Sequence, residues 1–289
     1  MARKFAWVLV LVALALGTLS DLPRRNPRIV LGGYRVLAAD LHVHSFPFSW
    51  ATLGPLNTVL EAQRQGLDVI AMTGHNHVWV AKAGRWFSRL TGTPTVLVGE
   101  EIVAPRYHLL AIGIEKTVSW KQSAADAIGE VHRQGGIAIA AHPLAPFWPA
   151  YDAGAMSNLD AAEVLHPVIY TRPQTYAELQ QFYERGPRTA IGDSDFHGLG
   201  PMGLCRTFVF ARDDSQSSIL EALRDRRTAV YDREGNAFGA PDLVNLTRQD
   251  PRFNPLPLPK PGRLSLLSRT AGLLGMLGVL LFSGARERT

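Results

Sequence analysis

The chain has 289 residues, of which 46% are apolar, and it carries a formal charge of +5 with a pI of about 9.5. This length allows one large domain, and the apolar content allows a sizeable core. The basic excess is scattered rather than arranged in a stripe with aromatic residues, so we expect no nucleic-acid partner. The single cysteine, Cys205, excludes an internal disulfide and leaves the cellular compartment undecided.

Both ends of the chain have the pattern of membrane segments. An uncharged apolar run covers residues 5–19, and its length is near the lower limit for crossing a hydrocarbon core of ~30 Å. We expect residues 1–20 to be a signal peptide or an N-terminal membrane anchor, followed by a basic linker over residues 21–35. We also expect a Pro-rich linker over residues 251–263 and a transmembrane or amphipathic segment over residues 264–284. Arginines lie on both sides of both segments and leave the orientation open, but the basic residues at the two chain ends favour both termini inside, which predicts a membrane-anchored, extracytoplasmic central domain.

Residues 36–250 have the pattern of one alternating domain. Short apolar runs recur along this part of the chain: "RVLAAD", "LDVIAMT", "TPTVLVG", "YHLLAIGI", "GIAIAAH", "LDAAEVL", "RTAIGDS" and "RTFVFA". Helical patterns lie between several of these runs, over residues 56–65, 123–134, 175–185 and 215–225. Near-continuous apolar strands that alternate with helices indicate a parallel α/β sheet or barrel.

Polar side chains of the kind that bind metals follow these apolar runs. Asp40, His42 and His44 end the first run, and they share one face of a strand because strand side chains alternate. Further runs end or begin in residues of the same kind: His75, His77, Glu100, Glu101, His108, His142, Glu163, His166, Asp193, Asp195 and His197. A lone strand-end histidine is more often an ordinary solvated residue, but repetition at five strand ends argues against this alternative for the set. Since the strand ends of a parallel barrel open on one face, we expect a shared metal site there.

As an ordered set, these motifs resemble those of a known family. "DLHVHS", "TGHN", "GEEI…HLLAIG", "AHP" and "GDSDFH", between residues 39 and 231, are similar to the motifs of the PHP (polymerase and histidinol phosphatase) superfamily. The superfamily includes metal-dependent phosphoesterases, and CehA/McbA-type metallohydrolases are a related branch. The resemblance implies a distorted (β/α)7 TIM-like barrel with the metal site at the C-terminal ends of its strands.

The resemblance also implies a set of metal ligands. One ion would be held by His42, His44, Glu101 and Asp195. A second ion would share Glu101 and use His108 and His142, and a third would use His75 and His197. The expected cofactors are therefore two or three divalent ions, and ligands of this kind accept zinc, manganese or iron.

Three details qualify this assignment. The family pattern is Gly-any-Glu, so Gly99 selects Glu101 rather than Glu100 as the ligand. Gly74 stands where the family commonly has aspartate, and Ser49 stands at about the place of another family aspartate. Each replacement removes a carboxylate near the third metal position and so weakens that position. His77 either compensates for them or is a solvated loop residue.

The function that follows is hydrolysis by a hydroxide that bridges two ions. If the third metal position is empty, we expect His197 or His75 to act as a general acid. Asp40 either orients a ligand histidine or is a strand-end turn residue. A phosphate ester is the favoured small-molecule substrate. Arg106 and Arg172 lie in loops beside ligand strands, and each is either a solvated loop residue, which is the favoured interpretation, or a contact to the phosphate. An aromatic rim of Phe147, Trp148 and Tyr151 keeps a second alternative open, an amide or carbamate-ester hydrolase of the CehA type. A third alternative is a catalytically degraded, membrane-tethered binding module.

Overall fold

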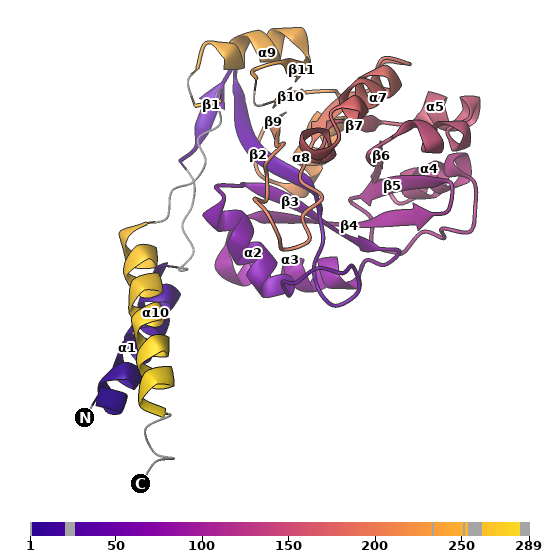
Figure 1. Ribbon diagram of the computed structural model, residues 1–289. Coiled ribbons are helices and arrows are strands. Elements are labelled where there is room, and N and C mark those ends of the chain that lie inside the picture. The colour runs from indigo at the N-terminus through magenta and orange to yellow at the C-terminus, as the bar shows by residue number, and fades with distance from the viewer. Residues whose placement is uncertain (1, 21–26, 233, 251, 254–261, 284–289) are drawn as a thin grey trace. The chain divides into compact units, whose positions relative to one another are not determined.

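The computed structural model describes five stretches of the chain: residues 2–20, 27–232, 234–250, 252–253 and 262–283. The chain forms two compact units, one from residues 25–257 and the other from the two terminal segments (Figure 1). The larger unit contains the sheet and all the predicted ligands.

The larger unit is built on one mixed sheet. Its strands are β1 (Ile29–Leu31), β2 (Tyr34–Val43), β3 (Val69–His75), β4 (Thr95–Ala104), β5 (Tyr107–Ile112), β6 (Ile137–Ala140), β7 (Ala161–Leu165), β8 (Thr189–Gly192), β9 (Thr207–Ala211), β10 (Thr228–Tyr231) and β11 (Ala237–Gly239). Their order is β11-β10-β9-β2-β3-β4-β5-β6-β7-β8, with β1 paired to β2. Residues 29–31, which lie inside the expected linker, therefore form a strand.

The sheet curls into a nearly closed barrel, which confirms the distorted TIM-like fold. Side chains from β9 and β10 join β8 across the remaining seam. The Thr207 hydroxyl accepts from the Gly192 amide at 2.9 Å and donates to the Gly192 carbonyl at 2.8 Å. The Thr228 hydroxyl donates to the Ala190 carbonyl at 2.9 Å. Hydroxyl hydrogen bonds thus take the place of a backbone ladder at the closure.

The sheet differs from the predicted parallel barrel in four strands, because β1, β5, β9 and β11 run against the others. β2–β3, β3–β4, β6–β7 and β7–β8 are parallel, whereas β5 is antiparallel to both neighbours and β9 is antiparallel to β2. The physical reason for β5 is the connection, because only Pro105 and Arg106 separate β4 from β5, and two residues allow a hairpin but no parallel crossover. The hairpin places the start of β5 at the same end of the barrel as the end of β4.

Helices surround the barrel: α2 (Pro55–Arg64), α3 (Trp79–Thr91), α4 (Ala124–Arg133), the 3-10 turn η1 (Ala145–Ala150), α5 (Ala153–Asn158), α6 (Val168–Thr171), α7 (Gln174–Tyr183), α8 (Gln216–Arg224) and α9 (Pro241–Arg248). The four predicted helices are confirmed as α2, α4, α7 and α8. α4 begins where Ser123 accepts a hydrogen bond from the Asp126 amide at 3.1 Å, and Gly135 follows its end with φ +76°.

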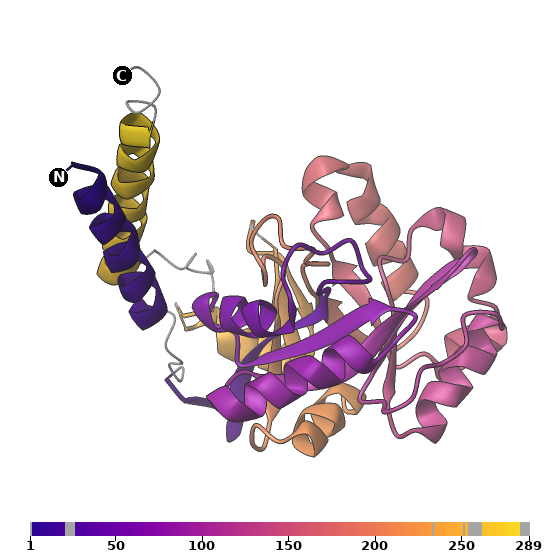
Figure 2. The same cartoon turned by 90° about the horizontal axis from the view of Figure 1, so that it is seen from below.

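The sequence prediction missed α3, which packs on β3 and β4 (Figure 1, Figure 2). Its buried face contains Val80, Ala81, Gly84 and Ser88, which are mostly small residues. Gly84 sits directly against Met72, because a Cβ at this position would lie 2.0 Å from the Met72 sulfur. The close approach explains why a helix whose buried side chains are small still packs tightly.

The terminal segments form the helices α1 (Ala2–Ser20) and α10 (Arg263–Ser283), which run side by side (Figure 1, Figure 2). Both are long and apolar enough to cross a membrane. Ser268 donates a hydrogen bond to the Ala13 carbonyl at 2.7 Å, and a Cβ at Gly275 would lie 2.9 Å from the Ala6 carbonyl. Most of the Pro-rich linker expected over residues 251–263 lies outside the described residues.

Gly99 offers a test of the β4–β5 hairpin. A Cβ at Gly99 would lie 2.7 Å from the Ala111 carbonyl oxygen, so Gly99→Ala should push the strands apart and destabilise the chain by about 1–3 kcal/mol. Gly129→Ala is the matched control, since its Cβ would meet only the Arg133 guanidinium at an ordinary 3.5 Å. Thermal denaturation of the two variants measures the difference, and equal midpoints would contradict the packing described.

Candidate metal centre

The structure brings all eight predicted metal ligands together at one end of the barrel. They fall in three groups, within each of which the ligand atoms lie within 4.8 Å of one another: His42, His44 and Asp195; Glu101, His108 and His142; His44, His75 and His197. His42, His75, Glu101 and His142 come from the carboxyl ends of parallel strands or the residues that follow them. His108 joins them from the start of β5, because the hairpin pairs it with Val103 near the end of β4.

Glu101 lies at the centre of these groups and is 2% exposed. Its Oε1 lies 2.8 Å from His108 Nδ1 and 3.3 Å from His142 Nε2. Its Oε2 faces three other imidazole nitrogens: His42 Nε2 at 3.4 Å, His44 Nε2 at 3.5 Å and His75 Nε2 at 3.2 Å. The two oxygens therefore face different ligand groups, which is the geometry of a carboxylate that can bridge two ions.

The donor atoms fit divalent cations. His42 Nε2 and both ring nitrogens of His44 are buried and have no hydrogen-bond partner among the described residues. Burial lowers the pKa of His44 to about 4, so its imidazole is neutral and has a lone pair available for a metal. Unpaired buried nitrogens are costly unless something satisfies them, and a cation that accepts imidazole and carboxylate ligands would do so.

Two ligands have an unusual backbone conformation. His142 has φ +27° and Asp195 has φ +46°, whereas residues with a Cβ seldom adopt positive φ. Both residues follow a short buried strand, β6 and β8 respectively. Such conformations concentrate at functional sites, where the surrounding structure holds a side chain in place.

Glu163 supports two of the ligands, and the sequence prediction gave it no role. Its Oε1 lies 2.8 Å from His42 Nδ1, and its Oε2 accepts from the His142 backbone amide at 2.6 Å. Burial opposes its ionisation, but the charge and hydrogen bond of His42 hold the pKa of Glu163 at about 2. The carboxylate thus accepts a hydrogen bond from His42 Nδ1–H and leaves Nε2 directed at the centre. In the sequence, the only indication of a role for Glu163 was its place at the end of the apolar run "AAEVLHP".

Asp40 is buried but makes no contact with a ligand ring. Its carboxylate accepts from the Ser194 amide at 3.1 Å, the Gly203 amide at 2.7 Å and the His42 amide at 3.3 Å. The Ser194 hydroxyl also donates to it. Asp40 therefore ties the segment that carries Asp195 to β2, and it positions His42 through the backbone rather than through the imidazole.

The third group, which contains His75 and His197, differs most from the family pattern. The Ser49 hydroxyl accepts from the His75 amide at 3.0 Å, so Ser49 does lie beside this group. A Cβ at Gly74 would lie 2.6 Å from the His77 ring. His77 therefore occupies the space of a side chain at position 74. It belongs to none of the three groups and packs between Phe48 and Trp79, with ring centroids at 5.3 and 5.6 Å.

Of the aromatic residues and arginines considered for substrate contact, only one aromatic ring lies against a predicted ligand. Phe147 stacks on His108 at 5.0 Å. Trp148 instead donates to the Pro143 carbonyl at 2.7 Å, and Tyr151 is buried with its hydroxyl on the His108 carbonyl. Arg106 and Arg172 are exposed, and neither lines the cavity beside His108.

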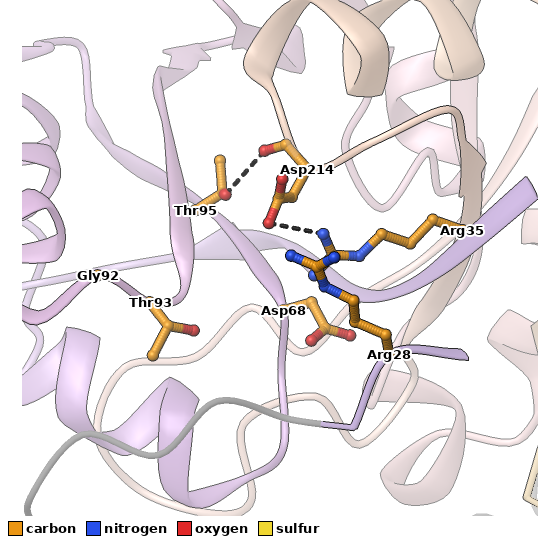
Figure 3. A pocket seen from close by; sticks show the side chains of 7 residues that line it. All are labelled: Arg28, Arg35, Asp68, Gly92, Thr93, Thr95 and Asp214. Carbon is orange, nitrogen blue, oxygen red and sulfur yellow. Dashed lines mark hydrogen bonds and ion pairs between the residues drawn. The ribbon is translucent and has the colours of Figure 1, made fainter. Parts of the chain in front are cut away.

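A second cavity, of about 120 Å³, contains none of the predicted ligands (Figure 3). Its lining residues are Arg28, Arg35, Asp68, Gly92, Thr93, Thr95 and Asp214. Arg35 pairs with Asp214 at 2.8 Å, and the Thr95 hydroxyl donates to the Asp214 carbonyl at 3.0 Å. Two arginines are matched by two aspartates, so this cavity has no net charge that would attract an ionic substrate.

Comparisons with known proteins agree with this picture. No family model matches the sequence. An uncharacterized protein of Methanocaldococcus jannaschii is 26% identical over 141 residues, which are 45% of this chain and 82% of that protein. A Bacteroides vulgatus crystal structure, of a two-domain protein containing a predicted PHP-like metal-dependent phosphoesterase, aligns with a TM-score of 0.62 and 27% identity. The alignment covers 78% of this chain and 74% of that one.

A further solved structure, an amidohydrolase from Chromobacterium violaceum, aligns with 15% identity over 57% of this chain and 89% of that chain. Its TM-score of 0.47 is too low to support an argument. The barrel, the ligand groups and the Bacteroides structure together indicate a fold of the metal-dependent phosphoesterase type. Within that class, the similarity to the PHP-like Bacteroides structure agrees with the resemblance of the motifs to the PHP superfamily.

Replacing Glu101 with glutamine tests the shared carboxylate. We expect Glu101→Gln to lower metal content at both adjoining groups and to reduce activity by at least about 100-fold, because even the loss of an outer partner costs 10–100-fold. Glu100→Gln is the control, since this carboxyl faces away and accepts from the Val118 amide at 2.5 Å. Burial raises the pKa of Glu100 to about 7, so a neutral amide is a close substitute. Equal metal content by elemental analysis would refute the bridging position.

Glu163→Gln tests the support of His42 and His142. Its amide group cannot accept from both the His42 ring and the His142 amide, so we expect metal affinity to fall about 10–100-fold. Glu178→Gln is the control, because Glu178 also accepts from a backbone amide, that of Ala145 at 2.7 Å, but is not part of the centre. Metal titration of both variants measures the effect, and unchanged affinity in Glu163→Gln would show that the ligands hold their positions without it.

Proposed function

We propose that this chain is a metal-dependent hydrolase of phosphate esters. The observation that carries the proposal is the Glu101 carboxylate, whose two oxygens face two different ligand groups. Paired cations at such a carboxylate suit in-line displacement at phosphorus, where both the attacking and the leaving oxygen need stabilisation. The description of the Bacteroides structure as a predicted metal-dependent phosphoesterase supports the same reaction.

The residues of this chain would bind and orient in that reaction. The bound ions would be zinc, manganese or iron, and they would supply a hydroxide nucleophile and offset charge on the phosphoryl oxygens. His42, His44, Glu101 and Asp195 would hold one of them, and His108 and His142 would complete the second position. His75 and His197 have side chains that are 25% and 33% exposed, so they lie where a leaving group would depart and could donate a proton to it.

An apolar groove beside His108 would take the organic part of the substrate. The groove has a volume of about 530 Å³ and is lined by Asn76, Val103, Ala104, Pro105, His108, Trp120 and Phe147. No lysine, arginine or carboxylate is among these lining residues. A neutral aromatic or aliphatic leaving group suits such a surface. The same groove would also suit a neutral amide or carbamate ester, which keeps that hydrolase as the second candidate.

The membrane is the proposed partner of the terminal helices. α1 and α10 would anchor the chain with both termini on one side and the catalytic unit in the extracytoplasmic space, as the flanking basic residues suggest. The degraded binding module has no support, because the ligand groups around Glu101 are complete despite the changes at Gly74 and Ser49.

The experiment is a substrate panel with the full chain, assayed with zinc, manganese and iron. We expect turnover of naphthyl phosphate to exceed that of a naphthyl carbamate. Trp120→Ala should lower kcat/KM for naphthyl phosphate roughly tenfold and leave methyl phosphate nearly unchanged, since it removes apolar contact with the leaving group only. Trp86→Ala is the control, because this exposed tryptophan on α3 does not line the groove. Exclusive turnover of the carbamate would overturn the phosphoesterase proposal.

A further inference from the structure

His166 has its proton on a defined ring nitrogen. The residue follows β7, is 7% exposed, and precedes the short helix α6 by one residue. Its Nδ1 accepts a hydrogen bond from the Val168 backbone amide at 3.1 Å. An imidazole nitrogen that accepts a hydrogen bond carries no proton, so the proton of a neutral His166 is on Nε2.

The protonated nitrogen points into the metal centre. His166 Nε2 is buried and has no hydrogen-bond partner in the described part of the chain. Asp195 Oδ2 is 3.4 Å away, which is longer than the 2.7–3.2 Å of a normal N–H···O bond. The ring lies edge-on to His142 at 5.2 Å, and its ligand-type nitrogen is within 4.8 Å of those of His42 and His142.

Proximity alone would make His166 another metal ligand, but its hydrogen bonding opposes that role. A ligand presents a lone pair, whereas His166 presents an N–H group. Binding a metal through Nε2 would move the proton to Nδ1, where it would face the Val168 amide hydrogen and lose that hydrogen bond. His42 differs, because Glu163 accepts a hydrogen bond from its Nδ1–H, and Nε2 is then the nitrogen that can bind a metal.

We propose that His166 is a substrate-binding residue whose Nε2–H donates a hydrogen bond to an anionic oxygen of the bound substrate. A phosphoryl oxygen held beside His142 and Asp195 would supply the acceptor that the described chain lacks. The donor would act without any metal contact, and it would favour a substrate oxygen that carries negative charge. The inference rests on the proposed hydrolase function and deepens it by assigning a recognition residue.

The first test reads the tautomer directly. Long-range ¹H–¹⁵N NMR correlations of the histidine rings, on the full chain in detergent micelles with and without zinc, should show His166 protonated on Nε2 in both states. His166→Gln identifies the signal. A His166 nitrogen shifted by zinc coordination, or a proton on Nδ1, would overturn the proposal. This readout does not depend on turnover, so a failure of the phosphoesterase proposal would remain distinguishable.

The second test measures binding of inorganic phosphate to the zinc-loaded chain. His166→Phe removes the donor and keeps a ring, whereas His166→Gln keeps an N–H donor. We expect metal content to be unchanged in both variants, phosphate affinity to fall about tenfold in His166→Phe, and the loss to be smaller in His166→Gln. Loss of an ion in both variants would make His166 a ligand. Full phosphate affinity in both variants would mean that His166 only accepts the hydrogen bond at the start of α6. Ion loss or full phosphate affinity in both variants would overturn the proposal. If His166→Phe fails to fold, His166→Gln and the tautomer measurement still decide.

Discussion

One buried carboxylate sets the constraints on the rest of the site. Glu101 faces imidazoles that come from four strands and the segments that follow them. Each of these side chains must therefore lie at the same level along the barrel axis as Glu101. The parallel pairing of β3 with β4 meets this requirement directly, because His75 and Glu101 are paired residues in the ladder. A shift of one residue in that register would turn Glu101 to the other face of the sheet and place Glu100 at the centre.

The antiparallel β5 explains how a ligand only seven positions after Glu101 can share its site. A parallel strand after β4 would have to begin at the opposite end of the barrel and could not present its first residues to the metal centre. The tight Pro105–Arg106 connection reverses the chain at once, so the first residues of β5 lie beside the last residues of β4. Gly99 is part of the same arrangement, since the bare Cα lets the two strands approach at the Ala111 carbonyl.

The sequence was sufficient for the strand ends, for four of the helices and for the residues that gather around Glu101, because apolar periodicity and the order of the motifs report them directly. It could not give the direction of β5 or β9, since a buried apolar run reads the same in either direction. It missed α3, whose buried face consists largely of small residues such as Ala81 and Gly84. It also could not assign Glu163, whose partner His42 is 121 positions away, or the tautomer of His166, which depends on one backbone amide.

The contact between position 74 and the His77 ring has a consequence for how the family can vary. The space beside Gly74 holds either a side chain on that residue or the imidazole of His77, but not both. An aspartate at position 74 is therefore compatible only with a smaller or displaced residue at position 77. In related sequences we therefore expect these two positions to change together, and the aromatic contacts of His77 with Phe48 and Trp79 to be present only where position 74 is small.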